Sequence, residues 1–291
     1  MNCNLCPRKC NIDRSINPGF CSAKQDIFIA KYMLHKWEEP IISGTAEQKG
    51  SGAIFFSGCN LKCIYCQNHE ISNSMVGKKY SIEELINLFK QLEKMGALNI
   101  NLVTPTHYTD QIIQALTIYK PKVPVIWNSS GYENVEEIEK LKDVVDVYLV
   151  DLKYLNSDLA KELSFAPNYP DIACKVILQM KKNQPKDIFE NGLIKRGVII
   201  RHLVIPNAIE NSLQCLNWIN SNMGKNQIIS VMSQYTPCHL ALNTEKYNRK
   251  LHVIEYKRVI SHLNKLKFNN GFIQELESAS SNYIPNFKVD I

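Results

Sequence analysis

The sequence predicts an α/β protein built as an open, three-quarter (β/α)6 barrel, a partial form of the TIM-like barrel. Short apolar segments alternate with amphipathic helical segments between residues 53 and 267. Strands that are apolar along their whole length are typical of a parallel sheet covered by helices. Six such units fall short of the eight that close a full barrel, so we expect an open sheet.

The expected elements follow one another along the chain. Residues 27–42 predict extended structure, because apolar side chains roughly alternate there. The strands of the barrel are expected at 53–57, 98–103, 123–127, 147–150, 197–204 and 228–232. Ser81 begins a helix as a capping box with Glu84. Further helices are expected around 112–116 and at 134–142, 157–163, 169–184, 209–222 and 249–267.

The composition is that of a globular protein rather than a membrane or disordered one. Hydrophobic residues make up 45% of the chain, and 34 basic against 28 acidic residues give a net charge of +6. No apolar run approaches the length of a membrane span. The basic residues form no long block, which makes a nucleic-acid partner unlikely on sequence grounds. The ten cysteines are clustered, which favours metal sites in a reducing cytoplasm over a disulfide framework.

The chain divides into three expected regions: a cysteine-rich extension (1–24), the barrel (25–275) and an irregular tail over the barrel (276–291). The extension contains Cys3, Cys6, Cys10 and Cys21 in the spacing C-x2-C-x3-C-x10-C. So short a segment has no core of its own, and a bound metal would substitute for one. Four thiolates suit either a closed zinc site or an auxiliary [4Fe-4S] cluster. A metal-free tail is the third alternative.

A second group of cysteines follows the first strand of the barrel. Cys59, Cys63 and Cys66 have the spacing C-x3-C-x2-C, with Tyr65 just before the last of them. A [4Fe-4S] cluster takes four ligands, so three thiolates leave one iron open to a small molecule. The alternative is a structural zinc loop, but such loops pair their cysteines as C-x2-C and close all four positions. No cysteine follows Cys66 until position 174.

This cysteine run resembles the signature of the radical S-adenosylmethionine (SAM) superfamily. Two further elements, Asp151-Leu152-Lys153 and the strand from Arg201 to Pro206, are similar to elements of its pyruvate formate-lyase activating enzyme-like group. The resemblance implies a radical SAM type barrel, a site-differentiated [4Fe-4S] cluster and reductive cleavage of SAM to a 5′-deoxyadenosyl radical that abstracts hydrogen. It also implies an electron donor such as flavodoxin or ferredoxin, and a glycyl-radical enzyme or peptide as partner.

Asp151, Lys153 and Arg201 are the charged candidates for binding SAM. A carboxylate accepts from ribose hydroxyls or an amino group, and Lys153 or the planar Arg201 fork pairs with a carboxylate. For each of them a structural ion pair at a strand end is the alternative.

The polar candidates for the cofactor site are Tyr65, Thr104, Thr106, Asn128 and Ser130. Asn128 and Ser130 belong to a run suited to ribose or adenine, which a helix-capping turn explains equally well. Thr104 and Thr106 stand where activating enzymes usually carry a Gly-Gly-Glu element. That departure leaves the substrate open.

The sequence assigns no catalytic residue. His107 and His202 flank the expected barrel mouth, although a structural histidine is the simpler interpretation, and Tyr235 is expected on the substrate side. By resemblance the protein is a radical SAM oxidoreductase, a glycyl-radical activase in the first instance. Radical modification of a peptide, nucleotide or small metabolite is the alternative within this class. A non-catalytic iron–sulfur electron carrier or sensor, and a nucleic-acid module with a zinc N-terminus, are the alternatives outside it.

Overall fold

The computed structural model of the 291-residue chain describes residues 2–276 and residue 287. Its strands are β1 (Ile27–His35), β2 (Ser51–Phe56), β3 (Lys78–Tyr80), β4 (Ile100–Val103), β5 (Val125–Ser129), β6 (Val147–Asp151), β7 (Ile188–Glu190), β8 (Leu193–Leu203), β9 (Ile228–Met232) and β10 (Gly271–Ile273). They form one sheet in the order β10-β9-β8-β6-β5-β4-β2-β1-β3, with β7 paired to β8 outside this path. From β2 to β10 the neighbours are parallel, whereas β1 pairs antiparallel with β2 and β3.

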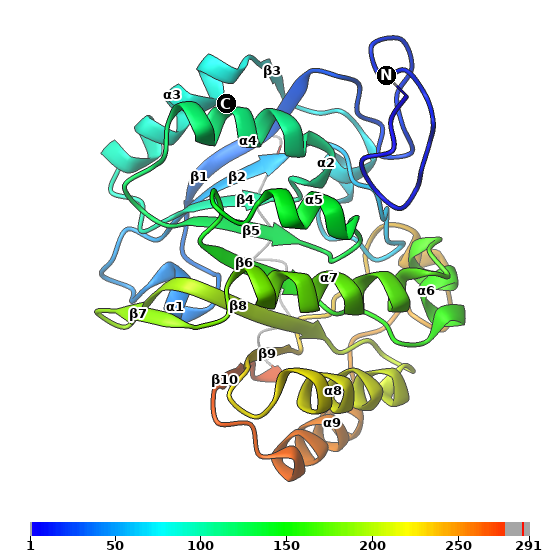
Figure 1. The fold of residues 1–291 in the computed structure, drawn as a ribbon. Coiled ribbons are helices and arrows are strands. Elements are labelled where there is room, and N and C mark those ends of the chain that lie inside the picture. Colours follow the sequence, from blue (N-terminus) through cyan, green and yellow to red (C-terminus); the bar gives the residue numbers. More distant parts are fainter. Residues whose placement is uncertain (1, 277–286, 288–291) are drawn as a thin grey trace.

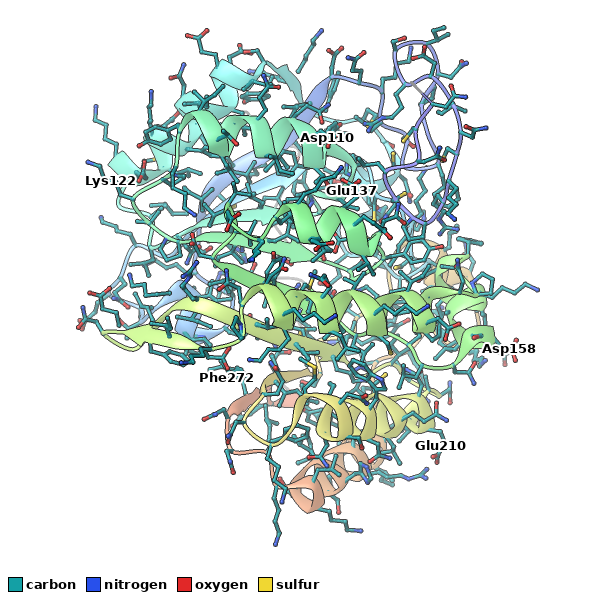
Figure 2. All side chains as sticks on the ribbon, in the orientation of Figure 1. Asp110, Lys122, Glu137, Asp158, Glu210 and Phe272 are labelled. Carbon is teal, nitrogen blue, oxygen red and sulfur yellow. The ribbon has the colours of Figure 1, made fainter. Side chains whose placement is uncertain are left out.

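The helices lie in the connections between the strands. They are α1 (Pro40–Ser43), α2 (His69–Asn73), α3 (Ile82–Lys94), α4 (Thr109–Ile118), α5 (Val135–Lys140), α6 (Ser157–Ser164), α7 (Tyr169–Asn183), α8 (Ile209–Met223) and α9 (Val253–Leu266), with 3-10 turns at Thr106–Tyr108 and His239–Asn243. Helices α3, α4, α5, α7 and α8 lie on one face of the sheet (Figure 1). Exposed acidic residues of the helices, such as Asp110 of α4, Asp158 of α6 and Glu210 of α8, lie on the outside of the molecule (Figure 2).

Alternation along the strands separates the two faces of the sheet. Trp127 and Val150 are buried in the main core, which includes residues of the covering helices. Ile126 and Leu149 face the other way and pack with Ile42 of α1 in a separate cluster. The segment after β1 therefore crosses the concave face of the sheet. Polar residues at the carboxyl ends of the strands that point to the same face as Ile126 and Leu149 also lie inside the barrel.

The expected partial barrel is confirmed: the predicted barrel strands correspond to β2, β4, β5, β6, β8 and β9, in parallel order. The extended segment at 27–42 is a strand only as far as His35, and α1 follows it. The sheet also continues to β10, which the sequence did not predict because Gly271–Ile273 is only three residues long. Strand β7 was missed for the same reason, since its three residues are all exposed and give no apolar pattern.

The N-terminal region is held by turns rather than by helices or sheet. Within residues 2–24 the regular pairing is a single bridge between Asn2 and Asp13. Figure 1 shows this region as the dark blue loop near α2. Apart from Leu276 and Phe287, the tail expected at 276–291 lies outside the described residues. In the part of the chain that the structure describes, no helix is long and apolar enough to cross a membrane.

Candidate functional site

The three-cysteine loop leaves the carboxyl end of β2 and leads into α2. Gly58 and Lys62, at φ values of +89° and +53°, turn the chain back on itself. Each sulfur accepts one hydrogen bond: Cys59 from the Leu61 amide (3.4 Å), Cys63 from Ser164 Oγ (3.0 Å) and Cys66 from Ser72 Oγ (3.5 Å). Hydrogen bonds of this kind stabilise thiolates and tune the reduction potential of an iron–sulfur cluster that the thiolates bind.

In this loop Cys63 is buried, and Cys59 and Cys66 are half-buried. Burial and the neighbouring Cys63 and Cys59 raise the pKa of Cys66 to about 12, and burial also raises the pKa of Cys63. Three thiolates side by side are therefore unfavourable unless a cationic centre offsets their charge. In the described residues, no three His, Cys, Asp or Glu side chains converge closely enough to hold a single metal ion. The donor set of this loop, three sulfurs with hydrogen-bond support, fits a multi-iron cluster.

A cavity of about 240 Å³ opens beside this loop, inside the barrel. Seven of the residues singled out in the sequence line it: Cys63, Tyr65, Cys66, Asn128, Asp151, Lys153 and Arg201. Tyr235, expected on the substrate side, lines it as well. The lining comes from the strands β1, β2, β4, β5, β6, β8 and β9 and from the segments that follow β1, β2, β6 and β9. The structure therefore gathers these residues around one space at the carboxyl ends of parallel strands, where such folds bind ligands.

A buried charge cluster forms one wall of the cavity. Arg201 donates from Nε to Asp151 (2.8 Å), from Nη1 to Glu38 (3.1 Å) and from Nη2 to Asn128 (2.7 Å). Lys153 Nζ donates to the other oxygen of Asp151 at 2.6 Å. Burial alone would raise the pKa of Asp151, but the charges of Arg201 and Lys153 outweigh it and hold that pKa at about 2. Asp151 is therefore ionised at any physiological pH.

The two cations of this cluster differ in what they can still bind. Arg201 uses three of its five N–H donors, one on each nitrogen, on Asp151, Glu38 and Asn128, so its guanidinium is fixed in one orientation and holds these side chains in place. The Lys153 ammonium has three donors and uses one of them on Asp151. Burial would lower the pKa of Lys153, but Asp151 raises it, so the ammonium stays charged beside the cavity. Lys153 is the better partner for an anionic group.

Comparison with known proteins places this geometry in a family. The family model described as Radical SAM superfamily matches residues 53–213, from β2 through the cysteine loop to α8. This chain belongs to the radical SAM superfamily. It is 32% identical over 269 residues to "Uncharacterized protein MJ0674" of Methanocaldococcus jannaschii, covering 89% of this chain and 73% of that protein.

Two more distant relatives are activating enzymes by name. The pyruvate formate-lyase-activating enzyme of Listeria monocytogenes is 24% identical over 170 residues, covering 54% of this chain and 63% of that enzyme. The pyruvate formate-lyase 1-activating enzyme of Escherichia coli is 24% identical over 146 residues, covering 47% and 58%. Among solved structures, Streptococcus suis SuiB bound to S-adenosylmethionine has a TM-score of 0.51 at 16% identity over 76% of this chain and 49% of that chain, which supports the fold.

Four other residues expected at the radical SAM site lie outside the lining of this cavity. Thr106 Oγ1 donates to Glu133 (2.9 Å), a buried carboxylate that also accepts from Trp127 Nε1 (2.7 Å) and Ser129 Oγ (2.7 Å). Thr104, with φ of +58°, pairs its amide with the carbonyl of Asn128, and the Ser130 carbonyl accepts from Tyr169. These residues shape the loops after β4 and β5. The amide of Cys59, the fourth, donates to the carbonyl of Cys21 in the N-terminal region.

Both candidate histidines are structural in their surroundings. His107 bonds the Ser57 carbonyl through Nε2, and His202 bonds the Leu152 carbonyl and Ser212 Oγ. Burial lowers the pKa of each to about 4, so both are neutral at physiological pH. Neither lines the cavity at the cysteine loop.

The sequence reading missed Glu38, which lines the cavity and receives hydrogen bonds from Arg201 and from Asn101 Nδ2 (3.1 Å). Burial raises the pKa of Glu38, and Arg201 opposes that rise only in part. Its one sequence signal was the acidic pair Glu38-Glu39 before a proline, which is common at surface turns. Nothing local indicates that this turn enters the barrel, because the contact with Arg201 spans 163 residues.

Proposed function

We propose that this protein binds a [4Fe-4S] cluster through Cys59, Cys63 and Cys66 and uses it to cleave SAM reductively. When bound, the cluster supplies the electron that splits SAM into methionine and a 5′-deoxyadenosyl radical, which takes a hydrogen atom from the substrate. One observation carries the proposal. The hydrogen-bonded three-sulfur loop opens directly onto a cavity lined by buried charged groups.

The side chains of the cavity would hold SAM by complementary charge. Lys153 would pair with the methionine carboxylate, since its ammonium reaches the lining and keeps two donors for a ligand. Asp151 would accept hydrogen bonds from the ribose hydroxyls or the amino group, and Asn128 would accept from or donate to the ribose hydroxyls. Arg201 and Glu38 fix those two side chains in place before the ligand arrives. Tyr65 and Tyr235, with ring centroids 5.8 Å apart, would exclude water from the reaction.

Thr104, Thr106 and Ser130 keep a supporting role in this proposal. They fix the loops after β4 and β5 through backbone pairs and the buried Glu133.

For the substrate we favour a glycyl-radical enzyme, activated by hydrogen abstraction from its glycine. Relatives named as pyruvate formate-lyase activating enzymes support this choice, although they match about half of this chain. A peptide is the second candidate, supported by the fold that this chain shares with SuiB, whose structure with the precursor peptide SuiA has a TM-score of 0.51. The electron would come from a flavodoxin or ferredoxin. None of the ten cysteines forms a disulfide in the structure, which supports a reducing, cytoplasmic location.

Product analysis under anaerobic conditions tests the proposal. The reconstituted protein, given SAM and dithionite, should yield 5′-deoxyadenosine and methionine. Cys63→Ala should abolish both products because it removes a proposed cluster ligand, whereas Cys174→Ala, at a half-buried thiol of α7 outside the cavity lining, should leave the yield unchanged. Full cleavage by Cys63→Ala would refute the ligand assignment. Absence of cleavage by the wild-type protein would favour a non-catalytic carrier or sensor.

A further inference from the structure

The four N-terminal cysteines come together in space. Cys6 and Cys21 are buried, and Cys3 and Cys10 are half-buried. A β-carbon placed on Gly19 would lie 3.4 Å from Cys21 Sγ and 3.6 Å from Cys10 Sγ, so these two sulfurs flank the glycine. Cys6 interacts electrostatically with Cys10 and Cys21, and Cys21 interacts with Cys3. The amide of Phe20 also donates to Cys10 Sγ at 3.3 Å. Residues 2–21 thus gather four sulfurs in one region, although among the described residues no three His, Cys, Asp or Glu side chains converge closely enough to hold a single metal ion.

This region is fastened to the three-cysteine loop by Arg8. Its guanidinium donates to the carbonyls of Asn60 (2.8 Å), Ser164 (2.9 Å), Phe165 (2.5 Å) and, more weakly, Leu61 (3.5 Å). Asn60 and Leu61 belong to the loop between Cys59 and Cys63, and Ser164 is the donor to Cys63 Sγ. A fixed guanidinium fork across four carbonyls holds the two cysteine groups in one orientation.

The two groups meet directly at Cys21 and Cys59. The amide of Cys59 donates to the carbonyl of Cys21 at 3.2 Å. The chains approach so closely that a β-carbon on Gly58 would lie 2.5 Å from that carbonyl oxygen. Lys62 Nζ adds a bond to Ser22 Oγ at 2.7 Å. A ligand residue of one group is therefore hydrogen-bonded to a ligand residue of the other, a short path for an electron.

The N-terminal group lies away from the cavity. Among the described residues, none of its four cysteines lines the cavity beside Cys63 and Cys66. Cys3 instead lines a shallow groove with Arg14 and Asp110, and Asp110 is exposed on α4. A centre bound there faces solvent on one side and the three-cysteine loop on the other. This placement suits a redox partner that docks outside, and it does not suit substrate binding.

We propose that Cys3, Cys6, Cys10 and Cys21 bind a second [4Fe-4S] cluster that relays electrons to the cluster at Cys59, Cys63 and Cys66. The relay rests on the function proposed above. One electron passes from a low-potential donor protein to the second cluster, and its iron is reduced. That electron then reduces the radical SAM cluster, and the second cluster returns to its oxidised state. The same electron finally enters the sulfonium of SAM, whose S–C5′ bond breaks to give methionine and the 5′-deoxyadenosyl radical.

Metal content tests the site without reference to activity. The variant with Cys59, Cys63 and Cys66 all changed to Ala removes the radical SAM cluster and should retain about four iron atoms per chain. Its dithionite-reduced form should give the electron paramagnetic resonance spectrum of a [4Fe-4S]+ cluster that SAM does not perturb. Zinc at about one atom per chain, with no iron, would overturn the proposal in favour of a structural site. An absence of both metals would overturn it as well.

A comparison of two reductants tests the relay. Arg8→Gln loosens the contact but keeps every cysteine, so it should retain the iron of the wild type. We expect at least a tenfold slower SAM cleavage with reduced flavodoxin, and less than a twofold change with Ti(III) citrate, a small reductant that needs no docking surface. Arg196→Gln, at an exposed arginine of β8, should change neither rate.

Equal losses with both reductants would show that Arg8 supports the structure only, and an unchanged flavodoxin rate would show that electrons bypass the N-terminal cluster. Either result overturns the relay. If the wild-type protein cleaves no SAM with either reductant, the function proposed above fails. In that case the metal content and spectrum of the triple-alanine variant still decide the second site, and the relay to SAM falls with the function.

Discussion

Replacement of Asp151 by Asn removes the centre of the buried charge cluster while keeping its shape. The Asp151 carboxylate binds Lys153 Nζ at 2.6 Å and Arg201 Nε at 2.8 Å, and all three side chains are 15% exposed. The pKa of Asp151 falls from 3.8 to about 2 in the fold, a shift worth about 2 kcal/mol of stability. Removing one partner of a buried pair typically costs about 3–5 kcal/mol, because it leaves charge uncompensated. We expect Asp151→Asn to lower the free energy of unfolding by about 2–5 kcal/mol at pH 7.

Urea unfolding followed by circular dichroism measures this loss. Because the pKa of Asp151 is lowered by folding, its contribution is complete above pH 3.8 and disappears as the pH falls through about 2. The difference between wild type and variant should therefore be constant from pH 7 to about pH 5 and should shrink below pH 4. Asp143→Asn, at an exposed aspartate, is the matched control and should stay within about 0.5 kcal/mol of the wild type. A loss for Asp151→Asn as small as that of the control would refute the assignment of a stabilising buried cluster.

Three further predictions concern the cavity, the core and the N-terminal contact. Lys153→Ala should weaken SAM binding about tenfold or more in calorimetry, which corresponds to the loss of roughly one charged hydrogen bond, and should retain the iron of the wild type. A loss of iron as large as the loss of SAM binding would instead indicate a structural role. His202→Gln should reduce the loss of stability on acidification. Burial lowers the pKa of His202 from 6.5 to about 4. The contribution of the neutral imidazole to stability is therefore complete above pH 6.5 and is lost as the pH falls toward 4. The partly exposed His262→Gln is the control, and identical pH profiles for the two variants would contradict this reasoning. Gly58→Ala should destabilise the protein by about 1–3 kcal/mol more than Gly224→Ala in urea unfolding. Both glycines have positive φ, but only at Gly58 would the added β-carbon contact the Cys21 carbonyl. Equal losses of stability would show that backbone strain alone is responsible.

The sequence predicts local features of this fold well and long-range ones poorly. The apolar strands and the helix capped by Ser81 were predictable because their signals lie within a few residues, and the structure contains both of that helix's capping bonds. The edge of the sheet was not predictable. Strands β1 and β3 pair across about fifty residues, and β10 is too short to show a pattern.

The candidate site shows the same division. Cys59, Cys63 and Cys66 are read from their spacing, and Asn128, Asp151 and Arg201 from their positions at strand ends. Glu38 could not be found in this way, since it reaches the cavity only because the segment after β1 crosses the concave face of the sheet. Conversely, Thr106 has the right chemistry and position in the sequence, but its hydroxyl bonds to Glu133.

Electron paramagnetic resonance of the anaerobically reduced protein, recorded with and without SAM, examines the open iron of the proposed three-cysteine cluster most directly. The Cys10→Ser variant should simplify the spectrum by removing a proposed ligand of the N-terminal site. SAM should shift the g values of the remaining signal, because its amino and carboxylate groups would bind the iron that has no thiolate. A signal that stays the same at saturating SAM would contradict SAM binding at this cluster, and with it the proposed chemistry.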